Sequence, residues 1–481
     1  MLTLDLLVIG TGPAGQRAAV QAAKLGKTVG IAERREVVGG VCINTGTIPS
    51  KTFREAVLYL TGFQQRGFYG SGYHLKESIS MPELLQRVDQ VVHREIQVIA
   101  AQMGRNRVRL IQGETSFVGP HDLIVRGAAQ SLEVRAERVV IATGTVPALP
   151  EGVPEDGHTV ITSDGVLGLK EIPRTLTVVG AGVIGVEYAS MFAALGVEVT
   201  LVDRRDRLLD FVDAEIAESL SHQMRAMGCT FRLSEDIDTI AVEGPRRTVV
   251  TLRSGKRVVS DLLLYATGRI GATAALNLPA AGLQADERGR IKVNERFETS
   301  APHILAVGDV IGFPSLASTS MEQGRRAVCY AYAVSCSSLP ELFPYGIYSI
   351  PEISMVGRNE AELTEAGVPY EIGVARYREI ARGAILGDDS GLLKMLFHRQ
   401  TRAILGVHII GTSATELVHI GQAVIAFGGT IDYFVDAVLN YPTFAECYKV
   451  AALDGYNKVG PPPGGAPPPG SGLHPPRASS P

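Results

Sequence analysis

The sequence contains no tryptophan and only five cysteines, which are Cys42, Cys229, Cys329, Cys336 and Cys447. The cysteines are odd in number and scattered, and they form neither a Cys-x-x-Cys motif nor the spacing of a Cys/His metal site. We therefore expect no structural disulfide, no bound metal and a reducing, cytoplasmic compartment.

Long apolar runs and a strong charge surplus are also missing. No apolar run approaches the roughly 20 residues that a membrane-spanning helix needs, and the N-terminal run contains Asp5 and continues into glycines, which indicates a strand rather than a signal peptide. The net charge of −4 gives no basic surplus for nucleic acid. We expect neither a membrane nor nucleic acid as a partner. With 45% hydrophobic residues, the 481-residue chain is typical of a soluble protein long enough for three domains.

The first informative motif is a glycine turn between two predicted strands. Residues 4–9 lead into a turn with three glycines, an alanine-rich helix is predicted from residue 13 to about 25, and a second strand over residues 29–32 ends on Glu33. Such glycines bring the backbone close to a pyrophosphate at a helix N-terminus, and the acid binds ribose hydroxyls. The alternative is a tight turn whose glycines serve packing alone. The predicted cofactor-binding residues are Gly10, Gly12, Pro13, Ala14, Gly15, Glu33 and Arg34.

The same pattern recurs later in the chain. Asp203 follows Gly185 at the interval that separates Glu33 from Gly15, and a predicted strand ending in Ala-Thr-Gly closes each half. An internal duplication is therefore visible, and two nucleotides held by one chain indicate electron transfer between them. The further predicted cofactor-binding residues are Ala142, Thr143, Gly144, Gly180, Gly182, Val183, Ile184, Gly185, Asp203, Arg204, Arg205 and Gly268.

The sequence between these motifs predicts other elements. Residues 52–110 are predicted to be mostly helical, because apolar residues such as Leu84, Val88 and Val92 follow a 3.6-residue period. The last segment, residues 460–481, holds nine of the 26 prolines and is expected to be a disordered Pro/Gly-rich tail.

Residues 39–51 carry a resemblance to a known family. They read Gly39-Gly40-Val-Cys42-Ile-Asn-Thr-Gly-Thr47-Ile-Pro-Ser-Lys51. This segment resembles the redox segment of the flavoprotein disulfide reductases with two dinucleotide-binding domains, which have a second cysteine where this chain has Thr47. A dithiol needs two sulfurs within reach of each other. With Thr47 in place of that cysteine, the pattern looks like the soluble, FAD-dependent pyridine nucleotide transhydrogenases.

A second departure from the disulfide reductases lies near the C-terminus. Tyr441-Pro-Thr-Phe-Ala-Glu446 matches the family's His-Pro-Thr-x-x-Glu, with tyrosine in place of the acid/base histidine. A tyrosine side chain titrates near pH ~10 and cannot exchange thiol protons at neutral pH. Two linked losses argue against dithiol chemistry more strongly than one. The alternative for Glu446 is a satisfied interface carboxylate.

The resemblance covers about residues 4–459, and residues 312–318 and 322–325 look like the transhydrogenase branch. It implies an α/β fold with two Rossmann-like dinucleotide-binding domains, the second inserted in the first, and a C-terminal α+β dimerisation domain. The implied boundaries are 1–150 and 273–344 for the FAD-binding domain, 151–272 for the NAD(P)-binding domain and 345–459 for the dimerisation domain. The partner of that last domain is a second copy in a homodimer.

The resemblance also implies a chemistry, a Si-specific transfer of hydride from NADPH through non-covalent FAD to NAD⁺. Lys51 and Glu187 pair near the flavin and nicotinamide in such enzymes, and Asp309 bonds the flavin ribitol. The alternatives are a solvated ion pair for Lys51 and Glu187, and a helix-capping role for Asp309. Cys42 either touches the flavin or fills space as a small hydrophobe. The implied catalytic residues are Lys51, Glu187 and Cys42, and the implied cofactor contacts add Gly39, Gly40, Gly308, Asp309 and Ala317.

Other functions stay open at this point. One is a dihydrolipoamide-dehydrogenase-like reductase that uses another thiol, such as Cys329, Cys336 or Cys447. Another is an NAD(P)H flavin dehydrogenase with a different acceptor, and a third is a non-enzymatic redox-sensing flavoprotein. The Asp203-Arg204-Arg205 run suits both nucleotides, because the acid can bond a free ribose hydroxyl and an arginine can bind a 2′-phosphate. The alternative is that the arginines face solvent and the site takes NAD alone.

Overall fold

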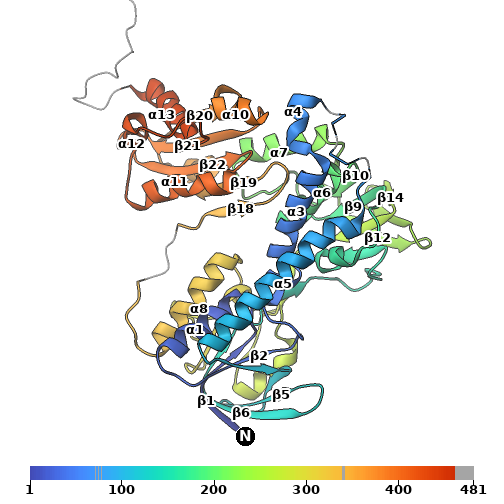
Figure 1. The fold of residues 1–481 in the computed structure, drawn as a ribbon, viewed down its shortest axis with the longest axis vertical. Helices are drawn as coiled ribbons and strands as arrows, with labels where there is room; N and C mark the ends of the chain where they lie inside the picture. The colour runs from blue at the N-terminus through green and yellow to red at the C-terminus, as the bar shows by residue number, and fades with distance from the viewer. Residues whose placement is uncertain (71, 74, 77, 338–341, 461–481) are drawn as a thin grey trace, which may run out of the picture. The chain divides into compact units, whose positions relative to one another are not determined.

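A computed structural model describes residues 1–460 except 71, 74, 77 and 338–341 (Figure 1). The predicted tail at 461–481 therefore lies outside the described residues. The chain divides into two compact units. One unit comprises residues 1–63, 74–208 and 224–341, and the other comprises 64–73, 209–223 and the residues from 342 onward.

The first unit contains a seven-stranded sheet ordered β3-β2-β1-β6-β5-β4, with β17 paired to β6. The strand β1 pairs in parallel with β2 and β6, and its two faces enter different hydrophobic clusters, with Leu6 and Val8 in one and Leu7 and Ile9 in the other. Burial on both faces explains its nearly continuous apolar sequence. The strands are β1 (Leu2–Ile9), β2 (Val29–Glu33), β3 (Arg109–Gln112), β4 (Glu114–Phe117), β5 (Asp122–Arg126), β6 (Ser131–Ile141) and β17 (Ile304–Ala306).

A second, parallel sheet in the same unit repeats this arrangement, with the order β11-β10-β9-β15-β8. The strands of this second sheet lie between β6 and β17 in the sequence, yet β17 pairs with β6. The first sheet is therefore built from two separate parts of the chain. The fold class that the resemblance implies is confirmed. The strands are β8 (Val160–Thr162), β9 (Thr175–Val179), β10 (Glu198–Val202), β11 (Thr230–Arg232) and β15 (Leu262–Tyr265). Smaller sheets are formed by β12 (Ile237–Val242), β13 (Thr248–Leu252) and β14 (Arg257–Ser260), and by β7 (Thr145–Pro147) and β16 (Arg269–Gly271).

Helices of the first unit follow the predicted motifs. The helix α5 begins with a capping box, in which Glu83 accepts from the Ser80 backbone N–H at 3.0 Å and from its hydroxyl at 2.8 Å. The helix α6 is apolar on all sides and almost wholly buried. The helices are α1 (Pro13–Lys24), α2 (Gly40–Asn44), α3 (Thr47–Thr61), α5 (Met81–Arg105), α6 (Val183–Ala194) and α8 (Ala317–Ala331), with short 3-10 turns η2 (Ser163–Gly168), η3 (Ala274–Leu276), η4 (Leu278–Ala281) and η5 (Gly308–Ile311).

The prediction of a mostly helical segment over residues 52–110 needs a partial correction. Helices α3 and α5 confirm it at both ends, but only η1 (Phe63–Gln65) and α4 (Arg66–Tyr69) lie between them in the described chain, and β3 begins at Arg109. The glycines at 62, 67, 70 and 72 explain the interruption, because glycine loses the most conformational freedom in a helix.

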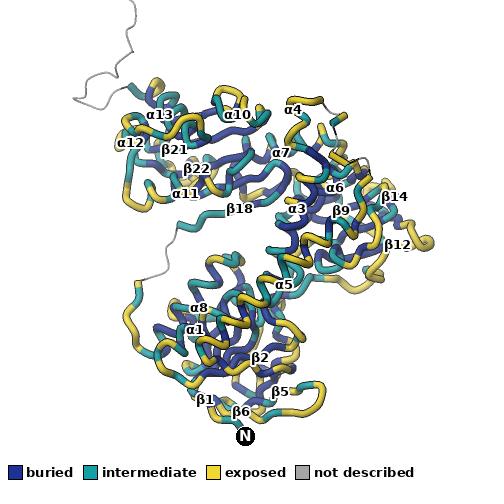
Figure 2. The backbone as a smooth tube through the Cα atoms, in the orientation of Figure 1, coloured by how far each residue is buried: buried dark blue, intermediate teal, exposed yellow. Residues whose placement is uncertain are grey.

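The second unit is built on an antiparallel sheet ordered β18-β19-β22-β21-β20. Helix α11 contacts β19 and β22, while α13 contacts β20 and β21. The inner strands β21 and β22 are mostly buried, as can be followed in Figure 2. The strands are β18 (Tyr345–Ile347), β19 (Ile353–Gly357), β20 (Tyr370–Arg376), β21 (Leu392–His398) and β22 (Ile404–Ile410). The other elements are α7 (Ala214–Ala226), which continues into the first unit, and α9 (Glu360–Glu365), η6 (Tyr377–Glu379), α10 (Ala381–Leu386), α11 (Ala414–Ala426), α12 (Ile431–Asp436) and α13 (Glu446–Val459). Among the described residues, no helix is long and apolar enough to cross a membrane.

Candidate active site

Each of the three glycines in the first turn is required for a different structural reason. Gly10 has φ +104°, and a Cβ there would lie 2.4 Å from the Ala142 carbonyl oxygen. A Cβ at Gly15 would lie 1.9 Å from the Gly10 carbonyl oxygen, so this glycine permits close helix packing. A Cβ at Gly12 would meet no described atom within 4 Å. The space at Gly12, immediately before α1, therefore fits a ligand group such as a pyrophosphate on a helix N-terminus.

The second turn repeats this geometry almost atom for atom. Gly180 has φ +110° and a Cβ there would lie 2.5 Å from the Ala266 carbonyl oxygen, while a Cβ at Gly185 would lie 1.9 Å from the Gly180 carbonyl oxygen. The middle glycine, Gly182, faces only the Arg205 guanidinium, with an Nη2 atom 3.9 Å from the Cβ position. Val183 and Ile184 begin α6 at this point, as Pro13 and Ala14 begin α1. Both turns therefore offer a nucleotide site of the same shape.

The two acids at the strand ends are held differently. Glu33 accepts from the Thr11 N–H at 3.1 Å and from the Arg35 N–H at 3.0 Å. Asp203 accepts from the Arg205 N–H at 2.8 Å, and also from the Arg205 side chain, through Nε at 2.9 Å and Nη2 at 2.8 Å. Burial acts to raise the pKa of Asp203, but these bonds and the Arg205 charge outweigh it and lower the pKa. Arg205 thus points at its acid, whereas Arg204 is exposed, as Arg34 is beside Glu33.

The segment that begins at Gly39 lies against the first turn. A Cβ at Gly40 would lie 2.8 Å from the Gly12 Cα, and the Gly39 N–H donates to the Thr11 hydroxyl at 2.9 Å. Cys42 on α2 is hydrogen-bonded to Thr47 on α3, and burial raises the pKa of its thiol. Cys42 therefore meets a hydroxyl where the disulfide reductases have a second sulfur. All five cysteines lie in the described chain and are free thiols there.

Lys51 and Glu187 form an ion pair between α3 and α6. The Lys51 Nζ donates to both carboxylate oxygens of Glu187, at 2.9 and 2.8 Å. The two side chains are 24% and 4% exposed. The same two helices pack through Phe53 and Phe192, whose ring centroids are 5.9 Å apart. Because α3 follows the Gly39 segment and α6 follows the second turn, this pair connects the two nucleotide motifs.

Asp309 also lies close to the first turn. A Cβ at Gly308 would lie 3.2 Å from the Ala14 Cβ, and one at Gly324 would lie 2.0 Å from the Ala14 carbonyl oxygen, so η5 and α8 both lie against the start of α1. The Gly308 N–H donates to Gln323 at 2.8 Å, and Ala317 begins α8. Burial raises the pKa of Asp309, and the positive charge of Arg269 opposes this. A buried carboxyl here, with Ser320 donating at 3.4 Å, suits a polar ligand group.

The strand ends also contribute to the two turns. Ala142 and Thr143 lie beside Gly10, and Gly144 and Gly268 both have a positive φ. The Thr143 hydroxyl and the Tyr188 hydroxyl are buried with no hydrogen-bond partner among the described residues. Burial and the Glu187 charge raise the pKa of Tyr188. An orphaned hydroxyl beside each nucleotide motif is what a site shaped for a polar cofactor would leave.

Sequence reasoning did not identify several of these polar residues. Asp164 accepts from Thr45 at 3.2 Å and from Arg269 at 3.3 Å, and the Arg35 guanidinium lies 4.0 Å away. Arg269 could have been found because it directly follows the Ala-Thr-Gly268 motif, but Asp164 and Tyr188 belong to no motif. The candidate site therefore has a polar network that sequence spacing does not reveal.

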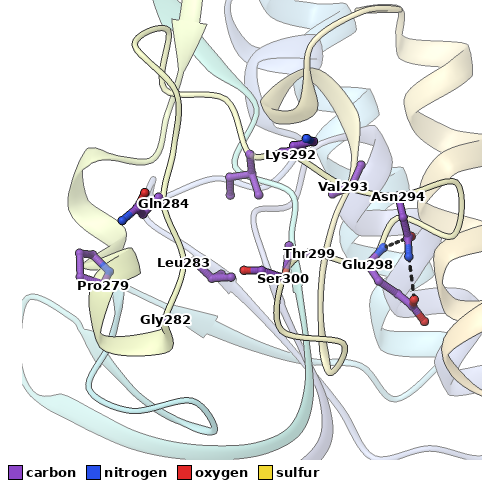
Figure 3. A pocket seen from close by; sticks show the side chains of 11 residues that line it. Pro279, Gly282, Leu283, Gln284, Lys292, Val293, Asn294, Glu298, Thr299 and Ser300 are labelled. Atoms are coloured by element: carbon purple, nitrogen blue, oxygen red, sulfur yellow. Dashed lines mark hydrogen bonds between the residues drawn. The ribbon is translucent and has the colours of Figure 1, made fainter.

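The C-terminal motif and a cavity share no residue with this cluster. Tyr441 belongs to the second unit and is 72% exposed, and one oxygen of Glu446 is buried with no partner among the described residues. A cavity of about 780 Å³ in the first unit is lined by none of the predicted site residues (Figure 3). Its lining comes from residues 279–300, including Gln284, Lys292 and Asn294.

Comparison with known proteins agrees with this geometry. The family model described as pyridine nucleotide-disulphide oxidoreductase matches residues 4–324, and the dimerisation-domain model of the same family matches residues 343–452. The chain is 54% identical over 461 residues to a protein of Mycobacterium tuberculosis named soluble pyridine nucleotide transhydrogenase, covering 95% of this chain and 98% of the relative. It is 44% identical over 462 residues to a Colwellia psychrerythraea protein of the same name, with the same coverage.

Solved structures share the fold. The flavoprotein disulfide reductase RclA of Escherichia coli matches with a TM-score of 0.84 at 28% identity, covering 93% of this chain and 99% of that one. LpdA of Mycobacterium tuberculosis matches with a TM-score of 0.86 at 26% identity, covering 94% and 99%. With two glycine turns of one geometry and near full-length relatives, the chain belongs to the pyridine nucleotide-disulphide oxidoreductases and, within them, to the family of the soluble pyridine nucleotide transhydrogenases.

Proposed function

We propose that this protein transfers a hydride between NADPH and NAD⁺ by way of bound FAD, without a redox disulfide. The observation that carries the proposal is the Lys51–Glu187 ion pair, because it joins the helix after the Gly39 segment to the helix of the second nucleotide turn. A flavin on the first turn and a nicotinamide on the second would meet beside this pair. When bound, FAD supplies a site that accepts a hydride and returns it.

The chain's own residues bind the nucleotides and stabilise charge at the reaction centre. Gly12 and Gly182 leave room for the two pyrophosphates, while Glu33 and Asp203 bind ribose hydroxyls. Lys51 keeps a positive charge at the reaction centre, and Glu187 holds that charge in place from a position that is almost fully buried. Asp309 binds the flavin side chain. Cys42 fills space beside Thr47 and carries no electrons.

Several finer points belong to the same proposal. We assign the domain boundaries at 1–150 with 273–344, 151–272 and 345–459, and a homodimer through the last of these, which overlaps the matched dimerisation domain at residues 343–452. The hydride transfer is Si-specific, and the protein works in the cytoplasm. The nucleotide preference depends on Arg204 and Arg205, which serve the 2′-phosphate of NADPH, while Asp203 serves the free hydroxyl of NAD(H).

The alternatives rely on features that favour them less. A dihydrolipoamide-dehydrogenase-like reductase would need another thiol within reach of Cys42, because Thr47 stands at the family's second cysteine position. An NAD(P)H flavin dehydrogenase with another acceptor would use the same residues, and a redox-sensing module has no need of the second nucleotide turn. One experiment separates these functions from the proposed one. It measures steady-state turnover of the purified FAD-bound protein with NADPH and thio-NAD⁺, with and without a disulfide substrate. Turnover that needs the disulfide substrate would contradict the proposal.

A further inference from the structure

The end of helix α8 reverses the chain onto itself. Ala333 has φ +54°, and the Val334 N–H donates to the Cys329 carbonyl oxygen at 2.8 Å, which is the six-to-one bond of a Schellman turn. The chain then runs back toward the helix, and the Arg326 Nη2 donates to the Ser337 hydroxyl at 3.4 Å. Cys336 lies in this returning segment. The turn therefore explains how two cysteines seven positions apart come together.

The two thiols are in contact. The Cys329 thiol and the Tyr330 hydroxyl each form a hydrogen bond with the sulfur of Cys336. Cys329 is 2% exposed, whereas Cys336 is half-buried and can be reached by a small reagent. Burial and the Cys336 sulfur raise the pKa of Cys329, so that this thiol is a donor to its neighbour. One sulfur is thus open to solvent, and the other is its buried hydrogen-bonding neighbour.

The surroundings of this pair are positively charged. Arg326 is 4% exposed, and its Nη1 atom is buried without a hydrogen-bond partner among the described residues. Arg325 and Arg326 both act electrostatically on Cys329, and Arg325 also on Cys336. A buried guanidinium with an unused donor near this pair can donate a hydrogen bond to a sulfur anion, which is the reactive form of cysteine. Glu322 accepts from Arg326 at 3.2 Å and balances part of the charge.

We propose that Cys329 and Cys336 form a reversible redox dithiol that reacts with hydroperoxides. The Cys336 thiolate attacks one peroxide oxygen, the O–O bond breaks, and the leaving hydroxide takes a proton to become water. The resulting sulfenic acid is attacked by the Cys329 sulfur, which gives up its proton, so that an S–S bond forms and a second water leaves. Two thiols and one hydrogen peroxide therefore yield one disulfide and two waters, and an external thiol reverses the reaction.

This dithiol is separate from the proposed hydride transfer. Cys329 is twelve residues beyond Ala317 on α8, which places it about 18 Å along the helix from the end that lies near Asp309. Cys42 offers an internal comparison, because its contact is the hydroxyl of Thr47 and no second sulfur can resolve a sulfenic acid there. Reversible disulfides in otherwise reduced proteins are mostly redox-sensing or catalytic.

The test uses the full-length protein with FAD bound, reduced with dithiothreitol, desalted and treated with hydrogen peroxide. Trypsin releases residues 327–358 as one peptide, which contains both cysteines and no other. We expect this peptide to lose two hydrogens, to resist alkylation, and to regain both thiols with dithiothreitol. The disulfide should form at least about tenfold faster than Cys42 is oxidised.

Three variants make the test specific. Cys336→Ser should abolish the reaction, and Cys329→Ser should leave Cys336 as a sulfenic acid that dimedone traps. Cys229→Ser removes a buried thiol elsewhere and should change nothing. The mass and alkylation of the wild-type peptide test the proposal even where a variant fails to fold. Two alkylatable thiols after peroxide, or direct oxidation of Cys336 to sulfinic acid in the wild type, would overturn the proposal.

Discussion

The Lys51 ammonium lies 2.9 and 2.8 Å from the two carboxylate oxygens of Glu187, although 136 residues separate them in the sequence. Neither residue type indicates a functional site alone, because lysine and glutamate usually face solvent. A glutamate side chain that is only 4% exposed needs a partner, however, and removal of one partner leaves the other charge buried and uncompensated. The pair therefore has a structural cost that a catalytic role would justify.

We predict that Lys51→Met and Glu187→Gln each reduce kcat for hydride transfer. A preorganised charge at a reaction centre is typically worth about a hundredfold in rate, and the double variant should lose little more than either single one because the two residues act together. Steady-state rates at saturating NADPH, with the FAD content measured in parallel, check this.

The control for that prediction is Lys76→Met. Lys76 also pairs with a glutamate, Glu83, but both side chains are far more exposed, at 43% and 36%. The loss of such a surface pair should leave kcat unchanged. Equal losses in Lys51→Met and Lys76→Met would show that the Lys51 effect is structural.

The glycines of the second turn give a prediction that separates binding from folding. Gly182→Ala places a methyl group where the nucleotide pyrophosphate is proposed to lie, so we expect a higher KM for both nicotinamide nucleotides with an unchanged melting temperature. Gly185→Ala would put its Cβ 1.9 Å from a backbone oxygen, and overpacking of this kind typically costs about 1–3 kcal/mol or more. A destabilised Gly182→Ala with normal KM would contradict the assignment.

Cys42→Ser should keep most of the activity between nicotinamide nucleotides. Because the Cys42 thiol meets the Thr47 hydroxyl, the substitution removes packing rather than an electron carrier. Cys229→Ser, at another buried thiol, is the matched control. A loss of turnover by orders of magnitude in Cys42→Ser alone, with FAD still bound, would mean that the sulfur takes part in the reaction.

Nucleotide choice should depend on the two arginines after Asp203. A charged hydrogen bond to phosphate is worth about 1.5–3 kcal/mol, so Arg204→Ala combined with Arg205→Ala should reduce kcat/KM for NADPH about tenfold or more. NADH should be affected far less, since it has no 2′-phosphate. The single Arg205→Ala also releases Asp203 from its ion pair and should improve NADH relative to NADPH.

The internal repeat supplies the control here. Arg34 follows Glu33 as Arg204 follows Asp203, and both arginines are exposed. Arg34→Ala should leave the ratio of NADPH to NADH activity unchanged. Equal losses for both nucleotides in the double variant would point to a site that takes NAD alone.

The sequence predicted most of the nucleotide-binding architecture because glycine turns and strand-end acids act locally. Gly10, Gly15 and Glu33 could be assigned from spacing, and their repeats at Gly180, Gly185 and Asp203 supported the same reading. The resemblance implied a first domain built from two separate parts of the chain, but the pairing of β17 with β6 that joins them could not be predicted, since no local pattern links residues so far apart.

The polar network could not be predicted in the same way. Asp164 lies in a short 3-10 turn with no motif, and only the fold brings Thr45 and Arg269 to it. The contact between Cys329 and Cys336 depends on a left-handed Ala333, a residue that turn propensities do not favour there. The break in helix after α3 does not follow from the apolar period, which belongs to α5; it reflects the four glycines that lie between the two helices.

The most direct test of the central claim is a rapid-mixing experiment without oxygen. The FAD-bound protein, with its accessible thiols alkylated, is mixed with one equivalent of NADPH and then with thio-NAD⁺. We predict that the flavin absorbance falls and then returns as thio-NADH forms, with both steps at least as fast as steady-state turnover. Flavin absorbance that thio-NAD⁺ fails to restore, but that a disulfide substrate restores in the unalkylated protein, would contradict the account.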